Sequence, residues 1–115
     1  MRIRIHAVPL EGGPQSTITI EQTGPDMATI DIDGVNYQVY DVRVGADGKT
    51  LVCKGGRPFP LTVTVQLIAS DASGATVSIS VVGGLINQTR RYRITPADEA
   101  DLTQFITGSK FPVLA

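Results

Sequence analysis

The chain carries one histidine and one cysteine, so it has few residue types for nucleophilic catalysis or metal binding. His6 shares a strand face with Arg2 and Arg4, without a partner that would orient its imidazole, and Cys53 follows apolar neighbours, which is typical of a buried structural thiol. A catalytic triad or dyad needs an oriented base, and a zinc site needs three or four such ligands. We predict no catalytic residue, no metal site and no disulfide.

Two carboxylates, Asp31 and Asp33, share a strand face, and Glu21 lies across a hairpin from Thr29. Paired acids can transfer protons or hold a cation. However, Asp33 and Gly34 form a turn dipeptide, and the further acids of a calcium loop are missing. The other glycines lie between predicted strands and none opens a phosphate loop, so the sequence indicates no cofactor.

The densest group of functional side chains is the run Arg90-Arg91-Tyr92-Arg93. Strand alternation places Arg90 and Tyr92 on the face that carries the apolar residues, and Arg91 and Arg93 on the outer face. A guanidinium on the inner face is costly to bury without a partner. Tyr37 falls on the same inner face, which makes these three residues our predicted ligand-binding site.

Two interpretations of the arginine remain open. In the first, Arg90 extends to water or pairs with an acid of the following segment, Asp98, Glu99 or Asp101. In the second, Arg90 and a tyrosine hold an anionic head group inside a cup.

The elements that must position these residues are strands. The chain of 115 residues contains 35 Val, Ile and Thr residues against 16 Ala and Leu residues, and side chains branched at Cβ favour sheet. Glycines and prolines divide it into short alternating pieces, whose connections allow only antiparallel neighbours. The predicted strands are 2–8, 17–23, 27–33, 35–44, 49–54, 61–70, 75–82 and 89–94.

The first hairpins can be tested by their register, because a correct pairing puts apolar residues opposite one another. We take Gly24-Pro25-Asp26 as one loop and Asp33-Gly34 as a two-residue type I′ turn. Beyond Val39 the apolar parity changes, which predicts a β-bulge between Val39 and Asp41. The predicted pairs are Ile20–Ile30, Ile18–Ile32, Ile32–Val35, Ile30–Tyr37 and Ala28–Val39.

The later hairpins are predicted in the same way. An odd loop, Asp71-Ala72-Ser73, followed by a left-handed Gly74, would place the apolar residues of 61–67 opposite those of 77–81. A longer loop, Gly83 to Gln88, would pair the last two strands. The predicted pairs across it are Val81–Arg90, Ile79–Tyr92 and Val77–Ile94.

One helix is expected, over residues 96–107. Thr95 is suited to the N-cap, Pro96 to the first helical position and Gly108 to the end. Its narrow apolar stripe, Leu102, Phe105 and Ile106, would lie on the sheet or close one of its ends, and the apolar tail after it would dock or add a strand. The length fits a single domain, 1–115, of mainly β class: about eight antiparallel strands in a meander that forms a barrel or strongly bent sheet, with one C-terminal helix.

Charge and hydropathy exclude several classes of partner. A net charge of -1 offers no cationic excess for nucleic acid. No stretch has the roughly 18 consecutive apolar residues of a membrane helix. The alternating N-terminus is unlike a signal peptide, so we expect a cytoplasmic protein, although a chain whose signal had been removed would look the same.

Eight short antiparallel strands in succession, followed by one helix, resemble the calycin superfamily of lipocalin-like barrels. Arg90-Arg91-Tyr92 is similar to the Arg-x-Tyr carboxylate clamp of fatty-acid-binding proteins. The chain departs from both patterns, because it has no Trp for the lipocalin Gly-x-Trp signature and no helix pair after the first strand. The resemblance implies an interior ligand whose anionic head group contacts Arg90 and Tyr92.

We therefore expect a non-enzymatic barrel that binds a small, partly apolar, anionic ligand. The alternative is an interaction or assembly module, a homo-oligomer or a subunit of a larger complex or of a phage or secretion particle. Its contact surface would be Tyr40, Val82, Ile68 and the tail Phe111 to Leu114. A third interpretation, an isomerase or cyclase that uses only Asp, Tyr and Arg, lacks an identifiable base.

Overall fold

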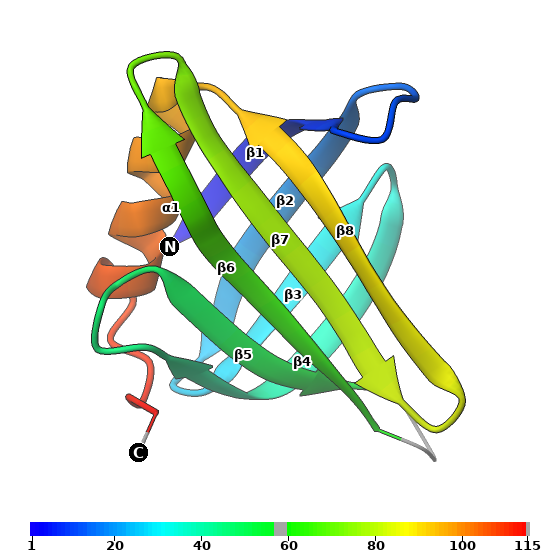
Figure 1. The fold of residues 1–115 in the computed structure, drawn as a ribbon. Coiled ribbons are helices and arrows are strands. Elements are labelled where there is room, and N and C mark those ends of the chain that lie inside the picture. Colours follow the sequence, from blue (N-terminus) through cyan, green and yellow to red (C-terminus); the bar gives the residue numbers. More distant parts are fainter. Residues whose placement is uncertain (57–59, 115) are drawn as a thin grey trace.

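The computed structural model describes residues 1–56 and 60–114. Its eight antiparallel strands follow one another around a closed barrel, and one helix follows the last strand (Figure 1). The fold class is as predicted. The elements are β1 (Arg2–Pro9), β2 (Ser16–Gly24), β3 (Met27–Ile32), β4 (Val35–Val44), β5 (Thr50–Gly55), β6 (Leu61–Asp71), β7 (Gly74–Gly83), β8 (Ile86–Ile94) and α1 (Pro96–Gly108).

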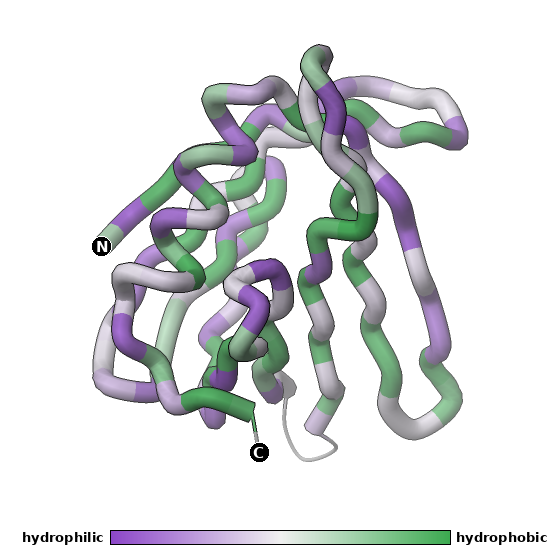
Figure 2. The backbone as a smooth tube through the Cα atoms, turned by 60° about the vertical axis from the view of Figure 1, so that its left-hand side comes forward, coloured by the Kyte–Doolittle hydropathy of each residue, from purple (hydrophilic) through white to green (hydrophobic). Residues whose placement is uncertain are grey.

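The barrel wall follows the alternation of the sequence, with hydrophobic residues alternating with hydrophilic ones along its strands (Figure 2). The five pairs predicted for β2, β3 and β4 are all present. Asp33 and Gly34 have φ values of 53° and 91°, as a type I′ turn requires. The predicted bulge is also confirmed, because the β4–β5 register shifts between Tyr40 and Arg43, and Asp41 has a φ of 54°.

Two later connections differ from the predictions. Asp71 pairs with Gly74 across a two-residue turn, and a bulge between Leu67 and Ala69 supplies the change of parity that we had assigned to an odd loop. Gly74 has a φ of 135°, and a Cβ there would collide with the carbonyl oxygen of Ile94, so the predicted glycine requirement holds.

The predicted pairing of β7 with β8 is wrong by two residues. Gly83 pairs with Ile86 across Gly84 and Leu85, so the segment that we expected to be a loop is mostly strand. Gly84 has the positive φ, 56°, that a two-residue hairpin turn needs. A shift of two keeps every side chain on its predicted face. The pairs are Val81–Gln88, Ile79–Arg90, Val77–Tyr92 and Ala75–Ile94.

Helix α1 packs against β1 and β7 and closes one end of the barrel. The hydroxyl oxygen of Thr95 accepts a hydrogen bond from the Asp98 N–H, which confirms the N-cap, and the predicted stripe of Leu102, Phe105 and Ile106 is buried. The Asp98 carboxylate accepts a hydrogen bond from the backbone N–H of His6 on β1, with 2.9 Å between nitrogen and oxygen. None of the described helices is long and apolar enough to cross a bilayer.

The tail after the helix docks on the same end. Phe111 is buried, with its ring centroid 5.8 Å from that of Phe105, and Val113 forms a parallel bridge with Val44. The expectation that the tail docks or pairs is therefore confirmed. Phe111, however, belongs to the core, which corrects its assignment to a contact surface.

An interior chamber opposite the helix

The barrel is not filled by its own side chains. It encloses a chamber of about 940 Å³, which lies at the upper end of the range typical of small-molecule sites. Eight strands make a barrel just wide enough either to be packed solid or to hold one small ligand. Aliphatic side chains from β1, β2, β3, β6, β7 and β8 form most of its wall, together with Leu102 of α1.

The chamber becomes more accessible with distance from the helix. Leu102 is 1% exposed and Ile94 is 3% exposed, whereas Ile79 and Val63 are only partly buried. At the far end Ile86 is 43% exposed although it lines the chamber. The chamber is therefore a cup, closed by the helix and open between the hairpin loops at the other end.

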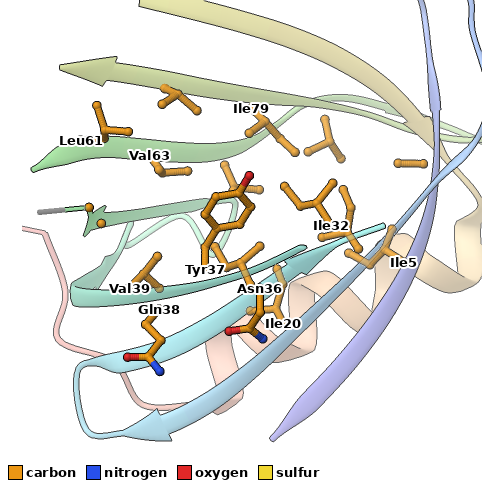
Figure 3. Close-up of a pocket in the computed structure, with 18 of the residues that line it drawn as sticks. Ile5, Ile20, Ile32, Asn36, Tyr37, Gln38, Val39, Leu61, Val63 and Ile79 are labelled. Carbon is orange, nitrogen blue, oxygen red and sulfur yellow. The ribbon is translucent and has the colours of Figure 1, made fainter. Parts of the chain in front are cut away.

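Tyr37 stands inside this opening. Its ring projects into the chamber, whereas Asn36 and Gln38 beside it point away (Figure 3). Tyr37 as a whole is 52% exposed, because few protein atoms surround it. The register brings Tyr37 to this place, since Ile30, its partner on β3, also lines the chamber.

Tyr92 lines the chamber as well, at a deeper position. It lies opposite Val77 on β7 and is 8% exposed. The structure thus places two of the three predicted ligand-binding residues, Tyr37 and Tyr92, on the wall of one cavity.

Arg90 lies apart from this wall. Its position on β8, between Gln88 and Tyr92, gives it an inward-facing Cβ, yet the side chain is exposed and is not among the residues that line the chamber. None of the ion pairs among the described residues involves Arg90 or an acid of the helix. Arg93 instead pairs with Asp71, with 2.6 Å between nitrogen and oxygen.

We attribute the exposure of the Arg90 side chain to the short pairing between the first and the last strand of the barrel. β1 and β8 pair only through Val8–Arg93 and Pro9–Tyr92, and the Leu10 N–H bonds the Arg91 carbonyl oxygen. The part of β8 before Arg91 therefore has β7 as its sole strand partner among the described elements. A long side chain on this strand can pass the open edge and reach water.

The other sequence candidates occupy structural positions. Cys53 is fully buried on β5, and burial raises the pKa of its thiol to about 12. His6 is exposed on β1. An Asp31 carboxylate oxygen accepts a bond from the Gly34 N–H, and one of Asp33 accepts from the Thr17 N–H, so both acids hold the turn. Within residues 1–56 and 60–114, no group of three potential metal ligands comes together.

Sequence reasoning missed part of the site. Gln88 and Ile86 line the chamber, but both fell in the segment expected to be a loop. Gly84 before Leu85 was the available signal, because glycine at the first central position is typical of a two-residue type II′ hairpin turn. The contribution of Leu102 was not visible, since it depends on where the helix docks. Residues 57–59 of the predicted β5–β6 connection, and Ala115 of the tail, lie outside the described residues.

Comparisons with protein-family models, curated proteins and solved structures found no match to this chain. The fold and the chamber geometry therefore carry the functional argument.

Proposed function

We propose that this protein is a non-enzymatic barrel that binds a small, largely apolar ligand in the chamber. The observation that carries the proposal is a volume of about 940 Å³ walled mainly by aliphatic side chains. Apolar surface that faces a water-filled space loses the stabilisation of burial, about 25 cal/mol for each Å², and a bound ligand would restore it. The open end provides a route of entry.

The polar side chains of the proposed site include Tyr37 at the mouth, Gln88 on β8 and Tyr92 deeper in the chamber, and Arg90 lies exposed on β8. An anionic ligand would place its charge at the mouth, where Arg90 could swing towards it. The meander topology is consistent with a calycin-like barrel, and membership of that superfamily, like a cytoplasmic location, is part of the proposal.

The test uses Nile red, an uncharged apolar dye, and native mass spectrometry of the purified protein. We expect dye fluorescence to rise on binding, and the mass to exceed that of the bare chain when a ligand co-purifies. Ile79→Trp should place a bulky ring in the chamber and weaken dye binding. Ser78→Trp, next to it on the outer face of β7, is the matched control and should leave binding unchanged. Equal dye binding by the two variants, or none by the wild type, would contradict the proposal.

A second function, an interaction module, is favoured by one observation. Three apolar residues are exposed together on the β7–β8 hairpin: Val82, Leu85, which is fully exposed, and Ile86. Ile68 is also exposed, as the alternative required, whereas Tyr40 is half-buried. Light scattering distinguishes this function: a mass that rises with concentration and falls in Leu85→Ser would support it, and a constant monomer mass would exclude self-association.

A further inference from the structure

Tyr92 carries a polar group that the protein itself leaves without a partner. Among the described residues its hydroxyl makes no hydrogen bond, although the residue is only 8% exposed. Every fully buried side-chain nitrogen or oxygen in the same residues does have a partner. The Tyr92 hydroxyl therefore keeps accessible surface, and since the residue lines the chamber, that surface faces the chamber. Buried tyrosine hydroxyls usually find a partner.

The surroundings of this hydroxyl are uncharged. Val77 lies opposite Tyr92, and Ile94 follows it on the inner face of β8. None of the described lining residues carries a charge. A carboxylate at this depth would lose its hydration without gaining a cation, which is strongly unfavourable, whereas a neutral oxygen would lose little and gain a hydrogen bond.

From these two observations, which rest on the proposed function, we infer the class of ligand. It is an uncharged, mostly hydrocarbon molecule with a carbonyl or hydroxyl oxygen that bonds the Tyr92 hydroxyl inside the chamber. Arg90 takes no part in holding it. The ligand oxygen thus marks a fixed depth, and the hydrocarbon contacts the aliphatic wall around it.

The inference is tested with three competitors of equal chain length against bound Nile red: undecane, 2-undecanone and undecanoate. In the wild type we expect 2-undecanone to displace the dye about fivefold better than undecane, the ratio expected from one net hydrogen bond. Tyr92→Phe removes only the hydroxyl and should abolish that ratio without changing the undecane affinity. Thr64→Val removes a hydroxyl from the outer face of β6, between the lining residues Val63 and Val65, and is the control that should preserve it.

A second readout does not depend on comparing variants by affinity. The carbonyl stretch of ¹³C-labelled 2-undecanone should shift to lower frequency in the wild type and in Thr64→Val, and should return to its unbonded value in Tyr92→Phe. The wild-type ratio and the wild-type shift test the inference even if Tyr92→Phe folds poorly.

The outcomes separate this inference from the proposed function. If ketone and hydrocarbon compete equally in the wild type, the inference is wrong and the apolar chamber stands. If undecanoate is the strongest competitor and Arg90→Gln removes its advantage, an anionic ligand replaces the neutral one. If none of the three displaces the dye and Ile79→Trp binds it as tightly as the wild type does, the chamber is not the site and both proposals fail.

Discussion

The two ends of this barrel are built from the same residue types but use them in opposite ways. At the helix end Phe105, Leu102 and Phe111 are almost fully buried and fill the space between the strands. At the open end Tyr37 and Ile86, an aromatic and an aliphatic side chain, face a cavity and stay about half exposed. The difference shows where the stability of the fold lies and where its binding capacity lies. Alternation along the strands creates both ends, and only the docking of α1 distinguishes them.

The largest contrast should come from deleting an aromatic ring at each end. Phe105→Ala should lower the free energy of unfolding by roughly 3–5 kcal/mol, because it leaves a cavity beside Phe111. Tyr37→Ala should cost about 1 kcal/mol or less, because its ring is already half exposed. Urea unfolding followed by circular dichroism measures both. Equal losses would mean that the open end is as important to stability as the packed end.

Enlarging a side chain sharpens the same contrast. Val42 is fully buried, so Val42→Phe should destabilise the protein by roughly 1–3 kcal/mol through overpacking. Val63 borders the chamber, so Val63→Phe should change stability by less than about 0.5 kcal/mol, because its ring has free volume to enter. Melting temperatures of the two variants, compared with the wild type, decide the matter. A large loss in Val63→Phe would show that the chamber is smaller than the structure indicates.

Local turn chemistry made much of the fold predictable. Asp33-Gly34 specifies a two-residue turn, and that turn fixed the register of β3 and β4 without any knowledge of the rest of the chain. The bulge at Asp41 was equally visible, because it changes the parity of the apolar residues. The β7–β8 register was missed, because Ile86, Asn87 and Gln88 have no alternation that separates strand from loop, and the glycine signal at Gly84 was not used.

For the site, the sequence predicted only the strand face on which each residue lies. Alternation placed Tyr37 and Tyr92 on the inner face, and both line the chamber. It also placed Arg90 there, but its course to solvent depends on how far β1 extends along β8, which is a property of the closed barrel. The chamber itself follows from the total volume of the interior side chains relative to the barrel, and no local pattern reports that volume.

A cysteine in the buried core and a cysteine on the chamber wall give a smaller but more local contrast. Cys53 is fully buried and is not among the chamber residues, and burial raises its pKa to about 12. Its reaction with a disulfide reagent at pH 8 should require unfolding, which slows it about a thousandfold or more relative to the unfolded chain. In a Cys53→Ala background, Ile79→Cys places a thiol on the chamber wall, and we expect it to react in the native state. Comparable rates for the two thiols would contradict the distinction between a fully buried position at Cys53 and an accessible chamber wall at Ile79.

The smallest effect is expected at the β6–β7 turn, which lies at the helix end of the barrel. There Asp71, Ser73 and Arg93 form an exposed group of hydrogen bonds and one ion pair. Hydrogen bonds from the Ser73 side chain and backbone, and then the nearby Arg93 guanidinium, lower the pKa of Asp71. A lowered carboxylate pKa stabilises the folded state above the usual value of 3.8, and that contribution is lost as the pH falls through the folded value.

The urea midpoint of Asp71→Asn should therefore lie slightly below that of the wild type at neutral pH, and the two should converge in acid. Ser73→Ala removes the side-chain hydrogen bond that lowers the Asp71 pKa most. In a Ser73→Ala background, Asp71→Asn should therefore change the urea midpoint at neutral pH by less than it does in the wild type. A gap that persists unchanged at pH 2 would show that Asp71 acts through the shape of the turn. In that case the charge of Asp71 would contribute nothing measurable at the helix end, and the contrast with the open end would be one of filled against unfilled volume.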